Sequence, residues 1–140
     1  MKVLIIIPAY NEEESIEKVI NNLKQNYSQY DYVIINDGSH DHTSEICHKN
    51  KYKIIDLPVN LGLTGAFQTG LKYAYKKGYD YAIQFDADGQ HLPEYIPAMV
   101  DKIEEGYDMV IGSRFVEKPK PRSLRMLGSR VISTAIKITT

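Results

Sequence analysis

Cysteine and tryptophan are nearly absent from this sequence, which contains one cysteine, Cys47, and no tryptophan. A single cysteine cannot form an intramolecular disulfide, and it excludes a zinc site built from several thiolates. Long hydrophobic runs are also lacking. The apolar N-terminal segment, residues 1–8, is too short for a signal peptide or a membrane span and is better explained as a first strand. We therefore expect a cytoplasmic, globular protein.

Charge is nearly balanced over the 140 residues, with a formal net charge of −1, but it is unevenly distributed. Residues 114–140 contain seven Lys or Arg and one acid, Glu117, which gives this stretch a charge of +6 and leaves −7 for residues 1–113. Such asymmetry favours an anionic partner for the C-terminal stretch. No nucleic-acid partner is expected.

Short apolar runs alternate with helical periodicity along the chain. The runs, at residues 3–8, 32–36, 53–57, 81–86 and 108–112, are almost continuously hydrophobic, as in strands buried on both faces. Between them, apolar residues recur at the spacing of amphipathic helices: Ile16, Val19, Ile20 and Leu23, and Ile96, Met99, Val100 and Ile103. This alternation predicts one α/β domain over residues 1–140, with a mostly parallel sheet flanked by helices.

Two further helical features are expected at the ends of this pattern. Asn11, ahead of three glutamates, is suited to cap the first helix. A last helix is expected from about Arg122, with an apolar face that includes Ile132 and Ile136. Because the pattern breaks off at Thr140 with that face uncovered, we expect the chain to be the N-terminal part of a longer protein.

Polar residues gather where the predicted strands end, which is the edge at which open parallel sheets bind ligands. Asp86 closes the fourth strand and Asp88 follows two residues later, so in an extended segment both carboxylates point to one side. With the amide of Gln90 they form an oxygen set suited to Mg²⁺ or Mn²⁺. The alternative is an acidic turn in which Asp88 caps the next helix, and the triplet alone does not decide. His91 is a further candidate ligand, although loop histidines are more often bystanders.

The end of the second strand also allows two interpretations. Asp37 can accept hydrogen bonds from the N–H groups of a nucleobase. The same segment is also typical of a turn that caps the second helix, with Asp41 as the cap. Further along, Gly62 and Gly65 suit either a loop close to a nucleotide or a tight strand-to-helix connection.

Five segments occur together in a characteristic order. They are residues 8–12 (PAYNE), 36–43 (NDGSHDHT), 60–70 (NLGLTGAFQTG), 86–94 (DADGQHLPE) and 111–115 (IGSRF). Together they resemble family 2 glycosyltransferases of the GT-A fold, a Rossmann-like nucleotide-diphospho-sugar transferase fold, and within them the polyprenyl- or dolichyl-phosphate sugar transferases. The resemblance covers nearly the whole chain. One departure is Asn36, which stands where the family usually has the first of two aspartates.

The resemblance implies a set of site residues. Nucleotide-sugar binding is assigned to Pro8, Tyr10, Glu12, Ile35, Asp37, Asp86, Ala87 and Asp88. A divalent cation, Mg²⁺ or Mn²⁺, is assigned to Asp86, Asp88 and Gln90 of this Asp-x-Asp motif, with Asp88 as the catalytic residue. Binding of the donor and acceptor phosphates is assigned to Arg114, Arg125 and Ser129.

The implied reaction is an inverting transfer of a sugar from a UDP- or GDP-linked donor. A sugar hydroxyl acceptor would need a general base, and no carboxylate of this chain is convincing in that role. A polyprenyl or dolichyl phosphate is already ionised, so we expect a lipid-phosphate acceptor and a longer protein at the cytoplasmic face of a membrane, which its C-terminal part would contact. Two alternatives remain: transfer to a saccharide hydroxyl in cell-surface polysaccharide synthesis, and a non-catalytic nucleotide-binding module.

Three other enzyme classes fit less well. A nucleotidyltransferase usually has a Gly-rich, basic loop after its first strand, and a Rossmann dehydrogenase has Gly-x-Gly-x-x-Gly there, whereas this chain has the PAYNE segment. A phosphatase of the haloacid dehalogenase type carries its Asp-x-Asp after the first strand rather than the fourth.

Overall fold

The computed structural model describes residues 2–87, 95–104, 109–113 and 132–137. Along the chain the elements are β1 (Val3–Ala9), α1 (Ile16–Asn26), β2 (Asp31–Asn36), α2 (Thr43–Lys49), β3 (Ile54–Asp56), α3 (Gly62–Lys76), β4 (Tyr81–Gln84), α4 (Tyr95–Glu104), β5 (Met109–Ser113) and β6 (Ile132–Lys137). Five strands therefore lie where the hydrophobic runs predict them, and β6 is an additional strand.

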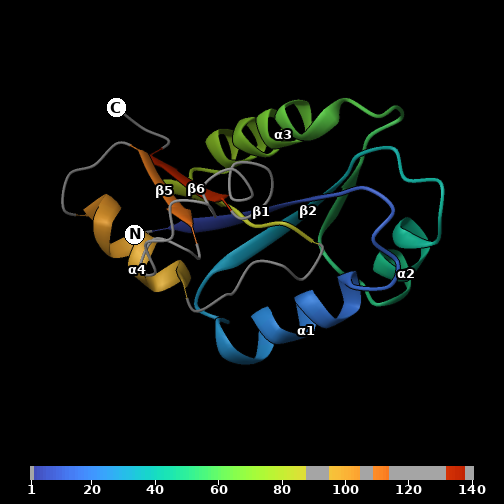
Figure 1. Cartoon of the computed structure of the whole chain (residues 1–140), viewed down its shortest axis with the longest axis horizontal. Helices are drawn as coiled ribbons and strands as arrows, with labels where there is room; N and C mark the ends of the chain where they lie inside the picture. Colours follow the sequence, from blue (N-terminus) through green and yellow to red (C-terminus); the bar gives the residue numbers. More distant parts are fainter. Residues whose placement is uncertain (1, 88–94, 105–108, 114–131, 138–140) are drawn as a thin grey trace, which may run out of the picture.

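A six-stranded sheet forms the centre of the domain, in the order β3-β2-β1-β4-β6-β5 (Figure 1). The strands β3, β2, β1 and β4 pair in parallel, whereas β6 runs antiparallel to both β4 and β5. The prediction of a mostly parallel sheet flanked by helices is therefore confirmed. Because β1 lies between β2 and β4, the ends of these three strands meet at one edge of the sheet.

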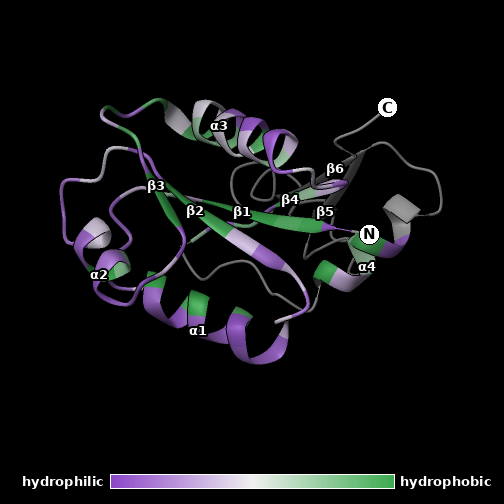
Figure 2. Ribbon diagram, turned by 180° about the vertical axis from the view of Figure 1, so that it is seen from behind, coloured by the Kyte–Doolittle hydropathy of each residue, from purple (hydrophilic) through white to green (hydrophobic). Residues whose placement is uncertain are grey.

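Helices cover both faces of the sheet, and each face has its own core. Successive residues of β1 alternate between them: Ile5 and Ile7 pack with residues of α1 and α4, whereas Leu4 and Ile6 pack with residues of α3. Figure 1 shows α3 on one side of the sheet and α1 and α2 on the other, and Figure 2 shows the hydrophobic residues of α1 turned towards the strands. Burial on both faces explains why β1 is an unbroken run of apolar residues.

The helical periodicities of the two amphipathic segments are largely confirmed. The four apolar positions of α1 are buried: Ile16, Val19, Ile20 and Leu23. In α4, Ile96, Met99 and Val100 are buried as well. None of the helices among the described residues combines the length and the apolar character needed to cross a bilayer.

The last predicted helix is wrong for residues 132–137, which form β6. Strand β6 pairs with β4 through Ala82↔Ile136 and with β5 through Met109↔Ile136. The apolar spacing of this segment fits a helix, but its β-branched residues also suit a strand, and pairing on both sides satisfies its backbone. Pairing between strands that are distant in sequence cannot be detected from the spacing of apolar residues within one segment. The start of that predicted helix, residues 122–131, lies outside the described residues.

Gly70 marks a close approach of α3 to the sheet. A Cβ atom added to it would meet Cγ2 of Ile6 and would lie 2.9 Å from Cδ1 and 3.0 Å from Cγ1 of the same residue, a β-branched side chain with no exposed surface. Alanine normally favours a helix over glycine by about 1 kcal/mol. Here the crowding outweighs this gain, so we expect Gly70→Ala to lower the free energy of unfolding by about 1–3 kcal/mol in urea titrations.

The exposed residue Gln68 of the same helix provides a matched control. Gln68→Ala is expected to stay within about 0.5 kcal/mol of the unaltered chain. Equal or higher stability of Gly70→Ala would show that α3 can move away from Ile6 without loss.

Candidate functional site

A pocket of about 300 Å³ lies where β1, β2 and β4 end and α3 begins. Its lining consists of Pro8, Ala9, Tyr10, Glu12, Asp37, Asn60, Gly62, Leu63, Asp86 and Ala87. Six of the predicted nucleotide-sugar residues are brought together here: Pro8, Tyr10, Glu12, Asp37, Asp86 and Ala87. Asp88, Gln90, His91, Arg114, Arg125 and Ser129 lie outside the described residues. Which ligands these six residues bind stays a prediction, but the fold does bring the six residues close together.

Ile35 does not line this pocket, although the resemblance assigns it to base or ribose contacts. Its side chain has no exposed surface and lies in the core that packs with α3. Alternation along β2 places Ile35 on that face of the sheet, one residue before the strand reaches its polar end. The Ile35 side chain therefore packs within the core, and its assignment to base or ribose contacts stays a prediction.

The carboxylate of Asp37 caps helix α3. One oxygen accepts hydrogen bonds from the backbone N–H of Leu61 at 2.7 Å, and the other from the N–H of Gly62 at 3.0 Å and from the Asn60 amide at 3.2 Å. Asp37 is only 4% exposed. Three of its roughly four lone-pair positions are thus used within the protein, which leaves little capacity for a nucleobase. The glycine at 62, with φ 85°, allows the tight entry into α3.

Asp41 caps α2, as the alternative interpretation of this segment predicts. Its Oδ1 accepts hydrogen bonds from the backbone N–H of Thr43 at 2.9 Å and from the Thr43 hydroxyl at 2.6 Å. Burial alone would raise the pKa of Asp41, but these bonds and one from the N–H of Glu13 hold it below its ordinary value. The β2–α2 turn is thereby fixed beside the pocket.

Asn11 does not cap α1, because the helix begins at Ile16 and Ser15 precedes it. Asn11 instead has a left-handed backbone, with φ 54°, a conformation that asparagine tolerates better than most residues. Its Oδ1 accepts hydrogen bonds from the N–H groups of His40 at 2.9 Å and Asp41 at 3.3 Å, and its own N–H donates to Ser39 Oγ at 2.9 Å. The β1–α1 loop is therefore fastened to the β2–α2 turn.

Further bonds strengthen this connection on either side of Asp41. The N–H of Glu12 donates to Thr43 Oγ1 at 2.8 Å, and Glu13 Oε2 lies 3.0 Å from His42 Nδ1. The hydrogen bond to Glu13 raises the pKa of His42, which is largely exposed. Tyr10 and Glu12, which line the pocket, are held by backbone that is braced at several points.

The hydrogen bonds of Asn36 account for an asparagine at a position where the family usually has an aspartate. Its amide donates to Asp56 Oδ1 at 2.8 Å, and its Oδ1 accepts from the N–H of Ser39 at 3.2 Å. Burial raises the pKa of Asp56, but bonds from Asn36, His48 and Ser44 outweigh it and hold that pKa below its ordinary value. An aspartate at position 36 would place two carboxylates against each other. The neighbouring turn is thus built around an amide.

At the other end of the pocket, Asp86 and Ala87 follow β4. The Asp86 side chain is half-buried, and Gln84 Nε2 lies 3.4 Å from its Oδ1. In the part of the chain that the structure describes, no three His, Cys, Asp or Glu side chains form a cation site. A carboxylate on the pocket wall nevertheless fits a hard divalent cation, and the other two members of the predicted set, Asp88 and Gln90, lie outside that part.

Comparison with known proteins decides the family. Residues 4–137 match Glycosyl transferase family 2. The chain belongs to this family. It is 40% identical over 136 residues to UDP-N-acetylglucosamine–dolichyl-phosphate N-acetylglucosaminyltransferase of Methanococcus voltae, covering 84% of this chain and 53% of that protein. It is 39% identical over 127 residues to dolichol-phosphate mannosyltransferase of Pyrococcus furiosus, covering 86% and 35%.

A solved structure shares the fold of this family 2 chain. Glucosyl-3-phosphoglycerate synthase of Mycobacterium tuberculosis, in complex with Mn²⁺, UDP-glucose and phosphoglyceric acid, matches with a TM-score of 0.69 and 20% identity. The match covers 98% of this chain and 57% of the synthase. The chain spans about half the length of several curated relatives that it matches.

The residue assignments from sequence missed three residues that line the pocket of this family 2 domain, Ala9, Asn60 and Leu63. They also missed Ser15, which contacts two of the lining residues. Its hydroxyl lies 2.6 Å from the carbonyl oxygen of Ala87 and 2.9 Å from Glu12 Oε2. A serine directly before an apolar helical pattern is a signal for a helix cap. Nothing in the sequence connects it with a residue that follows β4.

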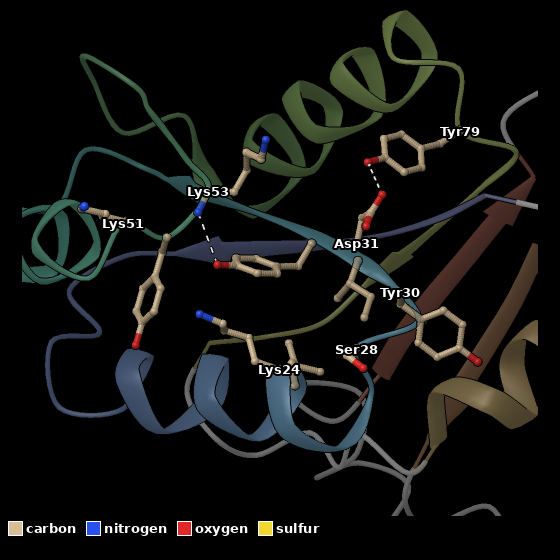
Figure 3. Close-up of a pocket in the computed structure, with 11 residues that line it drawn as sticks. Lys24, Ser28, Tyr30, Asp31, Lys51, Lys53 and Tyr79 are labelled. Carbon is tan, nitrogen blue, oxygen red and sulfur yellow. Dashed lines mark hydrogen bonds between the residues drawn. The ribbon is translucent and has the colours of Figure 1, made fainter.

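A larger cavity, of about 640 Å³, lies away from the polar strand ends (Figure 3). Its lining includes Asp31, which begins β2, and Tyr79, which precedes β4, so it borders the amino ends of strands. Tyr79 donates to Asp31 at 2.7 Å. The amines of Lys24, Lys51 and Lys53 end in different directions in Figure 3, so they do not converge on one anion. The smaller pocket therefore remains the candidate site of this family 2 domain.

Proposed function

We propose that this chain binds a UDP- or GDP-linked sugar and that, with the remainder of its protein, it transfers the sugar with inversion to a polyprenyl or dolichyl phosphate. The observation that carries the proposal is the pocket at the strand ends, which places Asp86 at one end and the start of α3 at the other. Family membership and the lipid-phosphate acceptors in the names of its relatives support it.

The two ends of the pocket suit the two ends of a nucleotide sugar. Large exposed hydrophobic side chains lie at or beside the α3 end, where Leu63 and Tyr10 line the pocket and Leu61 is close by. Such surface can contact the flat face of a nucleobase. At the other end, Asp86 is assigned to the diphosphate together with Asp88 and Gln90.

A divalent cation, Mg²⁺ or Mn²⁺, held by Asp86, Asp88 and Gln90 would neutralise the charge that develops on the departing nucleoside diphosphate. Glu12, Tyr10 and Pro8 would orient the nucleoside part of the donor. We assign Arg114 to the donor phosphates, and Arg125 and Ser129 to the acceptor phosphate. An acceptor phosphate is ionised at neutral pH, so it needs no general base, which agrees with the lack of a convincing one. Such an acceptor places the whole protein at the cytoplasmic face of a membrane.

Calorimetry of the full chain tests donor binding. The chain is titrated with UDP, GDP and their sugars, each with and without Mn²⁺. We expect one base to be preferred and its affinity to increase by about tenfold or more with Mn²⁺, which corresponds to about 1.4 kcal/mol. No binding of either nucleotide under any condition would refute the proposal.

A further inference from the structure

Ser15 occupies the position of a helix cap but does not act as one. It directly precedes α1, yet its side chain makes no capping hydrogen bond to the helix backbone. Serine is favoured at this position because its oxygen normally accepts a bond from one of the first N–H groups of the helix. The Ser15 hydroxyl instead contacts two residues that line the pocket, Glu12 and Ala87.

Two acceptors compete for the hydrogen of this hydroxyl. The carbonyl oxygen of Ala87 lies 2.6 Å from Ser15 Oγ, and Glu12 Oε2 lies 2.9 Å from it. A hydroxyl has one hydrogen to donate, and a carbonyl and an ionised carboxylate can only accept. The hydrogen therefore serves one acceptor fully or both in part.

These two acceptors belong to different segments of the pocket wall. Glu12 lines it from the β1–α1 loop, which the bonds of Asn11 fasten to the β2–α2 turn. Ala87 lines it after β4, and its carbonyl belongs to the peptide unit that leads to Asp88. Through its contact with Ala87, Ser15 Oγ joins this loop to the segment after β4.

We propose that Ser15 is a positioning residue that couples the side chain of Glu12 to the backbone of Ala87, next to Asp86. When a hydroxyl of a bound donor gives its hydrogen to Glu12, the carboxylate is shared between two donors and its bond from Ser15 weakens, so the Ser15 hydrogen shifts towards Ala87 and the backbone of Ala87 becomes firmer. Nucleoside binding thus prepares the segment that carries the cation ligands. This inference rests on the proposed function, because it requires a nucleotide in this pocket.

The experiment compares the affinity of the preferred nucleoside diphosphate with and without Mn²⁺ in the unaltered chain and in three variants. Ser15→Ala removes the hydroxyl and Ser15→Thr retains one. Ser44→Ala is the matched control, because Ser44 is also half-buried and donates at 2.9 Å to a carboxylate, that of Asp56, outside the pocket. The nucleoside without phosphate is titrated against each variant as well.

We expect Ser15→Ala to reduce the increase in affinity caused by Mn²⁺ by about three- to tenfold, the effect of one neutral hydrogen bond. Affinity for the nucleoside alone should stay within about twofold. Ser15→Thr and Ser44→Ala should retain the full increase. Backbone amides of residues 85–87 should exchange hydrogen faster in ligand-free Ser15→Ala than in the unaltered chain, with no such change in Ser44→Ala.

Distinct results would overturn the coupling and the function. If Ser15→Ala keeps the full effect of Mn²⁺, or if Ser44→Ala loses as much, the coupling is wrong while donor binding stands. An equal loss for the nucleoside alone would show that Ser15 only maintains the fold. If the unaltered chain binds no nucleotide at all, the proposed function itself fails, and the coupling with it.

Discussion

Asp86→Asn is expected to remove most of the increase in nucleoside diphosphate affinity that Mn²⁺ causes, about tenfold or more, because even residues that only support metal ligands cost 10–100-fold when changed. Asparagine has the shape of aspartate but lacks the charge that a hard cation requires. The half-buried side chain lies on the pocket wall, and its contact with Gln84, at 3.4 Å, is long. The free energy of unfolding is the second readout, because it separates a loss of cation binding from a loss of stability. Calorimetry and urea unfolding measure the two effects.

Asp80 offers a control for the loss of charge. It lies before β4, whereas Asp86 lies after it, and it accepts a hydrogen bond from the backbone N–H of Lys2 at 2.9 Å. Asp80→Asn changes the net charge equally but is remote from the pocket, so the effect of Mn²⁺ should persist. Asp88→Ala should behave like Asp86→Asn. Retention of the full Mn²⁺ effect in Asp86→Asn would remove this carboxylate from the cation site.

In contrast to Asp86→Asn, Asp37→Ala should act mainly on stability, with a loss of about 2–4 kcal/mol in the free energy of unfolding. The substitution leaves the N–H groups of Leu61 and Gly62 without their acceptor at the start of α3, whereas the Asn60 amide keeps its bond to the Asp37 carbonyl oxygen at 3.0 Å. Loss of a helix cap costs about 0.5–2 kcal/mol, and each buried donor left unsatisfied costs about 1–3 kcal/mol. Urea unfolding monitored by circular dichroism measures the change.

Asn60→Ala separates the contributions to this cap. It removes the amide that donates to the Asp37 carboxylate and to the Asp37 carbonyl oxygen, but it leaves the bonds from the backbone N–H groups of Leu61 and Gly62, so it should cost less than Asp37→Ala. If Asp37→Ala were within about 0.5 kcal/mol of the unaltered chain, the cap would contribute little, and Asp37 would be available for the nucleobase, as the resemblance implies.

Local patterns in the sequence predicted most of the sheet. Strand β1 can be recognised in the sequence because burial on both faces requires a continuous apolar run. Helix α1 can be recognised because burial on one face requires the helical spacing of Ile16, Val19 and Ile20. The position of polar residues after the strands also located the pocket, since the ends of parallel strands meet at one edge of the sheet.

Partners that are distant in sequence could not be predicted in this way. The acceptor role of Asp37 depends on where α3 starts, and the donor role of Ser15 depends on the path of the chain after β4. Asn11 precedes three glutamates as a cap would, but its backbone is left-handed and its side chain serves the next turn. In each case the residue type indicated a hydrogen-bonding role, and the three-dimensional fold determined the partner.

The place of β6 in the sheet also sets the order in which the domain can be completed. Strands β1, β2, β3 and β4 pair with one another, so they can assemble while the polypeptide is still being synthesised. In the described sheet β5 pairs with β6, which is made after it, and β6 separates β5 from β4. Until residue 137 has emerged, the edge of β4 is open and β5 lacks its partner. The nascent chain thus passes through a stage with exposed strand edges, at which other polypeptides can pair with it.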